Sequence, residues 1–413
     1  MAANAINIKH GWVWVFSIFI FFFNTFLLPE GFTYTLLLTP VWIYFLYLQG
    51  KLNIALLFLA PFTIYAIIHL ALGVYISYYF ISVTVMVALI FFLIAGAIFL
   101  ANPETNLDLI FRDLAILNFI FTAISIPLLF FPPLKHLVWY TVPISPNINF
   151  PRLKLFTEEA SHYSFLLAPV AIYFYSRIIF FKTTNPVLTV CIITLPLILS
   201  FSFGVLSCLL LSGLLIGIVY FKRVFSTVKR RFLVLVLAGL FVTSLIVIYK
   251  LFPDNPLFVR IHNIFNGDDT SARGRTYESF ILANKIIAQK SFLWGIGPGQ
   301  LKLIGRDIIV QYYYYSKIPK VIRIPNACAE TIIYFGYIGF ALRILIELTL
   351  FVTTRVYKNP YRLWLFLFVF IYQFTGSYIT NVAEYIVWLL VFSPVFAAYI
   401  SPQINYSPKT GNA

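Results

Sequence analysis

The chain consists of long apolar runs separated by short polar breaks, and this alternation continues almost from end to end. A helix needs roughly 20 apolar residues to cross a bilayer, and most of these runs are close to that length. We therefore predict an all-α, polytopic membrane protein with about twelve transmembrane helices in a single domain, residues 1–413. The first run has no small-residue cleavage site, so we expect it to be a retained helix. The predicted spans are 11–29, 31–49, 53–76, 79–100, 109–131, 161–181, 187–202, 203–221, 231–251, 329–352, 361–377 and 382–400.

The charges in the short loops predict how these helices cross the membrane. Loops on the cytoplasmic side carry an excess of Lys and Arg, whereas short outer loops do not. With the N-terminus inside, the short outer loops lie around Glu30, Tyr78, Phe201 and Asn381, and they contain no Lys or Arg. Both ends inside is therefore the predicted topology, and only the acidic inside loop at 102–108 does not support it. The basic residues of the inside loops are Lys51, Arg177, Lys182, Lys222, Arg223, Lys229, Arg230, Arg231, Arg355, Lys358 and Arg362.

Two outer loops are longer than a connection between neighbouring helices needs to be. The shorter covers 132–160, and the longer covers 252–328 and contains many Ile and Leu, so we expect it to be ordered. Within it, 273–292 has a helical pattern with Phe280, Ala283 and Ile287 on one face, as in a helix that lies on the membrane surface. The sequence GIGPG at 295–299 then predicts a turn that ends this helix.

The composition excludes a soluble protein. Of the 413 residues, 61% are hydrophobic and 10% are charged, and the mean hydropathy is +0.91. A soluble domain needs a more polar exterior than this. The net charge of +15 has an ordinary explanation in the cytoplasmic loops, so we expect no nucleic-acid partner. Cys191, Cys208 and Cys328 lie in or beside apolar runs without metal-ligand spacing, which favours buried small side chains.

A few polar residues fall within predicted spans or in tight turns. Arg343 and Glu347 are four residues apart on one helical face, and we expect an ion pair that neutralises itself and holds neighbouring helices together. His69 is predicted to be a packed polar contact. The adjacent acids at 268 and 269 are predicted to be turn residues, so no metal site is expected.

Basic residues gather in the long outer loop and at its start. A guanidinium can bind two phosphate oxygens through parallel hydrogen bonds. Lipid headgroups account for any single Lys there. For the close pair Arg273 and Arg275, the two alternatives are headgroup anchoring and binding of a phosphate-bearing, lipid-linked substrate. The basic residues are Lys250, Arg260, Arg273, Arg275, Lys285, Lys290, Lys302, Arg306, Lys317, Lys320 and Arg323.

The order of several short motifs carries a family resemblance. Thr270-Ser-Ala-Arg-Gly-Arg275, followed by the Gly-rich sequence at 291–300, resembles the O-antigen polymerase and ligase superfamily, in which an Arg motif, an amphipathic helix and Gly-x-Gly follow one another. Ile324-Pro-Asn-Ala-Cys-Ala-Glu330 is similar to the segment of that family that re-enters the membrane. Glu159-Ala-Ser161 is similar to the family's Glu-Pro-Ser, with Ala160 in place of Pro. Pro325 stands where the ligases have His before Asn.

The resemblance implies a GT-C-like glycosyltransferase of the bacterial inner membrane, with its active site facing the periplasm. Such an enzyme takes a growing glycan from undecaprenyl pyrophosphate and transfers it to the next lipid-linked oligosaccharide repeat unit. Membrane lipid and a chain-length regulator are the other partners implied. No metal or other cofactor is expected.

The candidate residues have distinct roles in that reaction. Arg275, supported by Arg273, is expected to stabilise the charge that develops on the diphosphate leaving group. Glu159 is the first candidate for the base that takes the proton of the acceptor hydroxyl, with Glu158 and His162 behind it. The other residues predicted to bind substrate are Arg152, Arg260, Arg323, Asn326 and Glu330.

Three other functions remain open from the sequence. A lipid-linked oligosaccharide flippase is expected to have short loops on both faces and two related halves, whereas this chain has one long, late loop. An O-antigen ligase uses the same donor, and Pro325 in place of His argues against it. A structural membrane protein leaves the Arg and Glu residues of the outer loops without a role.

Overall fold

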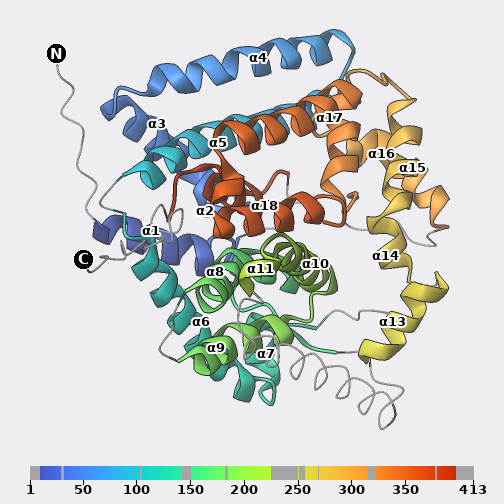
Figure 1. The fold of residues 1–413 in the computed structure, drawn as a ribbon. Coiled ribbons are helices and arrows are strands. Elements are labelled where there is room, and N and C mark those ends of the chain that lie inside the picture. The colour runs from blue at the N-terminus through green and yellow to red at the C-terminus, as the bar shows by residue number, and fades with distance from the viewer. Residues whose placement is uncertain are drawn as a thin grey trace, which may run out of the picture.

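The computed structural model describes residues 10–28, 32–102, 105–141, 150–181, 185–224, 250, 256–267, 269–314, 322–376 and 379–396. Nearly all of the predicted span 231–251 lies outside these residues. So do parts of the two long loops at 132–160 and 252–328, which keep the name outer loops from their predicted location. The described residues are mostly helical, with one short strand pair, which confirms the predicted all-α class (Figure 1).

Five helices in the described part are long and apolar enough to cross a membrane. They are α4 (Leu52–Ala71), α5 (Ile76–Ala101), α6 (Leu107–Leu128), α8 (Ala160–Phe180) and α17 (Ala327–Thr353). Shorter apolar helices coincide with other predicted spans, while the predicted number of spans stays a prediction. These are α1 (His10–Phe23), α3 (Thr39–Leu48), α9 (Pro186–Ser200), α10 (Phe203–Val219), α18 (Pro360–Tyr372) and α19 (Val382–Phe392).

Two apolar runs each contain a break in the helix. The break in the first run was not predicted, and the break in the second was. The run 31–49 contains two helices, α2 (Tyr34–Leu37) and α3, so one continuous span there is wrong. Pro40 has no N–H to continue the first helix and stands in the first turn of the second. The run 187–221 divides at Phe201, whose φ of 45° is left-handed, which confirms the predicted break between α9 and α10.

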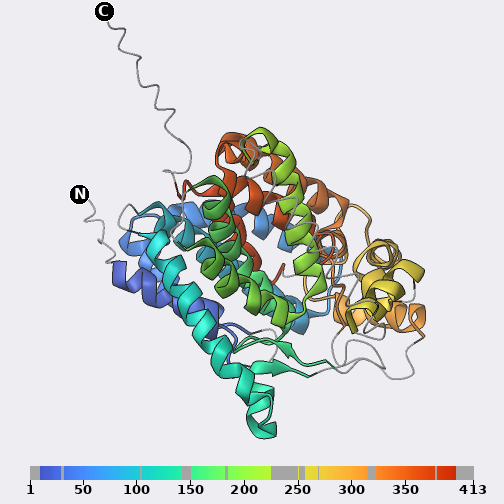
Figure 2. The ribbon, with the colours of Figure 1, turned by 60° about the horizontal axis from the view of Figure 1, so that its bottom comes forward.

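Helix α8 forms the centre of the bundle. Most of its side chains are buried, and α6, α9, α10, α18 and α19 pack around it (Figure 2). The hydroxyl of Tyr163 on α8 donates to Asn118 Oδ1 on α6 at 2.8 Å, so this polar contact is made inside the apolar core. Helix α4 lies at the edge of the molecule and exposes most of its apolar surface, as a lipid-facing helix does.

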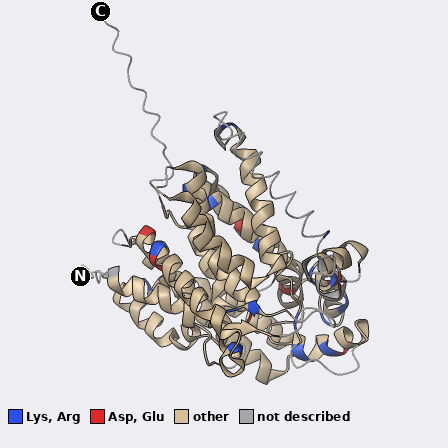
Figure 3. Cartoon of the chain, turned by 90° about the horizontal axis from the view of Figure 1, so that it is seen from below, with Lys and Arg blue, Asp and Glu red and all other residues tan. Residues whose placement is uncertain are grey.

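The outer loops fold into short elements beside the bundle. Charged side chains are sparse along the bundle helices and more frequent at helix ends and on these outer elements (Figure 3). The elements are α7 (Pro132–Val138), β1 (Trp139–Tyr140), β2 (Arg152–Leu153), α13 (Pro256–Asn266), α14 (Thr270–Arg275), α15 (Tyr277–Ile287) and α16 (Leu301–Tyr312). Two further short helices, α11 (Phe221–Val224) and the 3-10 helix η1 (Val356–Lys358), lie in other connections.

The helix predicted in the long loop is confirmed over α15, and its apolar face packs on the protein. Ala283 and Ile287 on the predicted apolar face, and the neighbouring Leu282 and Ile286, have no exposed surface. This face packs on α17, so its burial is within the protein. The apolar face is therefore used for packing within the protein, and the location of the helix at the membrane surface stays a prediction.

The glycine-rich turn docks onto a break in α17. Gly336 interrupts that helix with a φ of 67°, and Gly295 in the turn has a φ of 74°. Ile296 N donates to Ile333 O at 2.8 Å across the contact. A Cβ on Gly295 would lie 2.5 Å from the Ile333 oxygen, so only glycine permits this backbone approach.

His69 on α4 fixes the same turn from the other side. Its Nε2 donates to the carbonyl oxygen of Trp294 at 2.9 Å, and the residue has no exposed surface. Because a carbonyl oxygen only accepts, this bond sets the tautomer with the proton on Nε2. The prediction of a packed polar contact at His69 is confirmed.

A buried ionic cluster joins α17, α18 and α19. Arg343 Nε donates to Glu347 Oε1 at 3.0 Å and to Gln373 Oε1 at 2.9 Å, and its Nη2 donates to Glu384. Gln373 Nε2 in turn donates to the second oxygen of Glu347 at 3.0 Å. The predicted pair exists, but Glu384 is a second anionic partner, so the prediction of a self-neutralising pair is wrong. The predicted role in holding neighbouring helices together fits the geometry.

Replacing Gly295 with Ala is expected to destabilise the protein by about 3 kcal/mol or more, because strain at positive φ is combined with loss of the docked backbone contact. Gly73→Ala is the matched control, since Gly73 has a φ of 79° and a Cβ added there would have nothing within 4 Å. It should lose only about 1–2 kcal/mol. Thermal unfolding of the purified protein in detergent measures both, and equal losses would contradict the docking account.

Arg343→Met is expected to cost about 3–5 kcal/mol, because it leaves two carboxylates buried without their shared cation. Arg112→Met is the control. Arg112 pairs with Asp113 at 3.0 Å, but its side chain is 59% exposed. That change should cost about 0–1 kcal/mol. Denaturant or thermal unfolding compares the two, and a mild effect of Arg343→Met would show that the cluster does not hold these helices together.

Candidate functional site

The two outer loops and the bundle enclose a cavity of about 340 Å³. Its loop side includes the strand pair β1–β2, the end of α14 and the segment before α17. Its bundle side consists of the first residues of α8 and α10 and the end of α18. Arg152, Glu159, Arg275 and Arg323, four of the residues predicted from the sequence, line this single space.

Arg152 is positioned by the strand pair. Tyr140 and Arg152 are directly opposite each other in the antiparallel register of β1 and β2. The guanidinium of Arg152 lies over the Tyr140 ring, 4.8 Å from its centre, and both side chains line the cavity. A cation over an aromatic face is attracted to it, so the ring holds the arginine in place.

Arg275 is positioned through its backbone. It is the last residue of α14, and its carbonyl oxygen accepts a hydrogen bond from Asn326 Nδ2 at 2.8 Å. The same Asn326 nitrogen donates to Phe374 O at 2.7 Å, and Asn326 Oδ1 accepts from Ala329 N at 2.9 Å. The Arg275 guanidinium has no hydrogen-bond partner among the described residues, so its donors remain for a ligand.

Asn326 was predicted to bind substrate, but its side chain is used to hold the backbone around the cavity. Its amide is fully buried, caps α17 and bonds to two backbone carbonyls. With the amide used in this way, Asn326 holds Arg275 at the cavity and does not itself line it.

Arg273 does not support Arg275 at the cavity. Its Nε and Nη2 donate to Glu278 Oε1 at 2.7 and 2.5 Å, and its Nη1 donates to Gly267 O at 3.2 Å. Glu278 is fully buried at the start of α15, so this pair fixes the turn between α14 and α15. Residues two apart on a helix face different directions, which is why the predicted pairing of the two arginines is wrong.

Glu159 is the anionic residue of the cavity. It precedes α8 in extended conformation, with Ser161 Oγ donating to its Oε1 at 2.5 Å. Arg323 Nη2 lies 3.4 Å from Glu159 Oε2. Burial acts to raise the pKa of Glu159, but Arg323, the Ser161 hydroxyl and the charge of Arg275 outweigh it. The pKa therefore lies below its ordinary value, and Glu159 is a carboxylate at neutral pH.

The remaining predicted residues do not line the cavity. Glu158 interacts with Lys154, which is not a cavity residue either. His162 is buried in the first turn of α8, and Glu330 interacts with Tyr334 in α17. The side chain of Arg260, in α13, lies outside the described part of the structure.

One wall of the cavity was not predicted from the sequence. Ser202, Gly204, Ser207 and Cys208 come from the start of α10, and Thr375 follows α18. The polar break between α9 and α10 was recognised, but only as a boundary between spans. Two serines and a glycine within and just after that break were the available signal.

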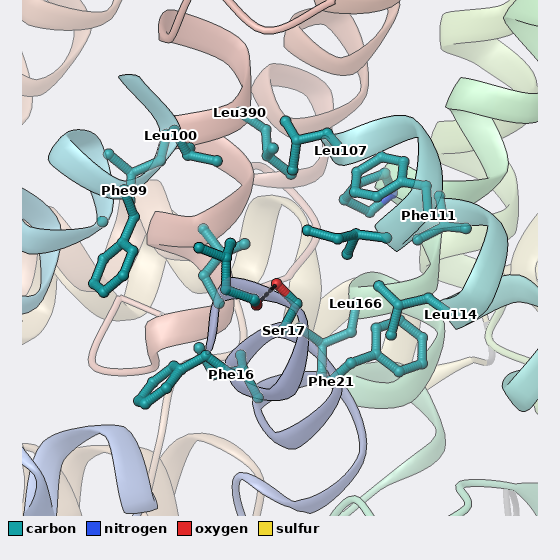
Figure 4. Close-up of a pocket in the computed structure, with 18 of the residues that line it drawn as sticks. Phe16, Ser17, Phe21, Phe99, Leu100, Leu107, Phe111, Leu114, Leu166 and Leu390 are labelled. Atoms are coloured by element: carbon teal, nitrogen blue, oxygen red, sulfur yellow. Dashed lines mark hydrogen bonds between the residues drawn. The ribbon is translucent and has the colours of Figure 1, made fainter. Parts of the chain in front are cut away.

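A second cavity of about 150 Å³ lies among α1, α5, α6, α8 and α19 (Figure 4). Phe16, Phe99, Phe111 and Leu390 are among its apolar walls. Ser17, the hydroxyl drawn there, donates to Val13 O at 2.8 Å and is satisfied by its own helix. This cavity offers no group for chemistry.

No cluster of three or more His, Cys, Asp or Glu side chains suited to a metal occurs within the described ranges. Asp269 caps α14 by accepting from Ala272 N at 2.8 Å, which agrees with the predicted turn role. The cavity thus combines guanidiniums and a carboxylate on its loop side with hydroxyls on its bundle side, an arrangement that suits an anionic group attached to a hydroxyl-bearing one.

Comparison of the chain with protein-family models and with curated proteins found no match in either.

Proposed function

We propose that this chain is a membrane glycosyltransferase that polymerises undecaprenyl-pyrophosphate-linked oligosaccharide repeat units into O-antigen or a related surface polysaccharide. In this proposal the fold is GT-C-like, the protein lies in the bacterial inner membrane, and the cavity faces the periplasm. The motif resemblance around Arg275 and Glu159 motivates the choice of reaction.

The observation that carries the proposal is the guanidinium of Arg275, which has no hydrogen bond or ion pair with the described residues, in a cavity shared with Arg152, Arg323 and Glu159. An arginine held by its backbone, with its side-chain donors open, is preorganised for an anion. The guanidinium fork matches the geometry of phosphate oxygens. A diphosphate, with several charged oxygens, can engage more than one of these arginines at once.

The reaction breaks the bond between the anomeric carbon of the donor glycan and the diphosphate oxygen. The electron pair of that bond leaves on the diphosphate, where Arg275 stabilises the developing charge. The acceptor hydroxyl oxygen forms the new bond to the anomeric carbon, and its proton passes to Glu159. Because the lipid diphosphate leaves as a stabilised anion, no separate acid is needed at the leaving oxygen.

In this proposal, binding of the diphosphate raises the pKa of Glu159 and so makes it a stronger base. In the free protein the Arg323 ion pair lowers the pKa of Glu159 and makes it a weak base. A bound diphosphate draws on the charge of Arg323 and adds negative charge close to Glu159. Both effects raise the pKa of the carboxyl toward the range of an effective general base.

Arg275→Ala, expressed at the normal level, is expected to leave cells with lipopolysaccharide that carries single repeat units but no long chains, because diphosphate departure is no longer stabilised. Arg275→Lys should remain impaired, since it keeps the charge and loses the fork. Gel analysis of lipopolysaccharide from a deletion strain carrying each variant measures chain length.

Arg306→Ala is the control for that experiment, because Arg306 is an exposed arginine of the same loop and does not line the cavity. It should retain long chains. Polysaccharide chains of unchanged length in the Arg275→Ala strain would contradict the assignment of Arg275 to the site. Loss of all repeat units from the core, single ones included, points instead to a ligase or a flippase.

Arg323→Gln is expected to raise the pKa of Glu159, because burial continues to disfavour the charged carboxyl while its nearest cation is lost. A base works only when unprotonated, so the acidic limb of the pH–rate profile should move to higher pH. Polymer formation by the purified protein, measured across pH as kcat/KM, reports this limb. An unmoved limb, with Arg306→Gln as reference, would rule out Glu159 as the base.

A further inference from the structure

The cavity has a second wall that the reaction above does not use. It is formed by Ser202, Gly204, Ser207, Cys208, Tyr372 and Thr375. None of these side chains is charged at neutral pH, in contrast to the arginines and the carboxylate on the loop side. The two sides of one cavity therefore suit two chemically different parts of a ligand.

The serine hydroxyls on this wall are open. Neither Ser202 nor Ser207 has a side-chain hydrogen bond to any of the residues that the structure describes. Ser202 precedes α10 and does not cap it with its side chain, whereas Ser207 lies within the helix, where a serine can bond to a carbonyl one turn back. Ser212, farther along α10, does so with Leu209 O at 3.0 Å and also accepts from Trp364 Nε1 at 3.1 Å. The difference coincides with the cavity, because Ser212 faces protein and the other two line the empty space.

The wall also has space and an aromatic surface. Gly204 leaves the region before the Tyr372 ring open, since a Cβ there would lie 3.9 Å from Tyr372 Cε2. A methyl group fits at that distance, whereas a longer side chain must enter the cavity. Open hydroxyls beside an aromatic ring match a sugar, whose hydroxyls exchange hydrogen bonds while its C–H face packs on a ring.

We propose that this wall is a subsite for a neutral pyranose ring, the sugar joined directly to the diphosphate that the arginines hold. The inference rests on the proposed function, because the diphosphate fixes which end of the glycan reaches the wall. It names the ligand class for residues of α10 and α18. The ring is neutral because a carboxylate on the sugar needs a cation, and this wall has none among its described residues.

Cys208 serves as a reporter within the wall. Cys208 lines the cavity as a buried side chain, so in a Cys191→Ser protein its slow modification by a small methanethiosulfonate reagent is followed, and a Cys208→Ser version gives the background. The probes are inorganic pyrophosphate, phosphatidylglycerol, and the oligosaccharide freed by mild acid from the lipid-linked repeat units of a strain that lacks this protein. The free oligosaccharide should slow modification, and Ser207→Ala should weaken that protection about three- to tenfold, the effect of losing one hydrogen bond.

A pair of glycine variants tests the same wall by size. Gly204→Leu should abolish protection by the oligosaccharide while binding of pyrophosphate, measured by displacement of a radiolabelled form, is kept. Gly217→Leu on the same helix is the control, since a Cβ added at Gly217 would have nothing within 4 Å. It should behave as the parent protein.

The outcomes separate the two proposals. Pyrophosphate binding that depends on Arg275, without protection by the oligosaccharide, overturns the sugar subsite and leaves the proposed function standing. Equal protection by phosphatidylglycerol assigns the wall to a lipid headgroup and also overturns the subsite. If neither pyrophosphate nor oligosaccharide binds, both proposals fall.

Discussion

Asn326 makes the contact on which the rest of the site depends. Its buried amide joins the end of α14, a residue just after α18 and the first turn of α17, three segments far apart in the sequence. An amide buried in an apolar bundle must find partners for both its nitrogen and its oxygen, so the three segments are held in one arrangement. Arg275 thereby reaches the cavity with its side chain uncommitted to any described residue.

The charged residues of the protein fall into two groups that differ in how completely they are satisfied. Arg273 and Arg343 are bonded to buried carboxylates and fix the positions of helices and turns. Within the described residues Arg275 has open donors, and Arg323 makes a longer contact with Glu159 at 3.4 Å. Fully paired charges stabilise a structure, whereas open donors in a cavity are prepared for a ligand. This contrast, more than the total of basic residues, marks the site.

The outer elements gain rigidity from the bundle. The glycine-rich turn bonds to the broken helix α17 and to His69 of α4, and α15 buries its apolar face on α17. Loop residues that carry function need a rigid support if their side chains are to be held in position. Here the support consists of backbone contacts that glycine alone permits at Gly295 and Gly336.

The sequence by itself determined the helical class, where most of the apolar helices begin, the apolar face of α15, and four residues of the cavity. Those features follow from local periodicity, charge and turn chemistry, which are written in neighbouring residues. Only the tertiary structure decided that Arg273 pairs with Glu278 and that Arg343 pairs with Glu384. It also decided that Asn326 donates a hydrogen bond to the backbone of Arg275. It also brought Ser202 and Ser207 into the same cavity as the arginines. Arg273 and Glu278 are close in the sequence, but the contacts of Arg343 with Glu384 and of Asn326 with Arg275 join residues 41 and 51 positions apart. Helix packing, which local pattern does not encode, selects these partners for the buried polar groups.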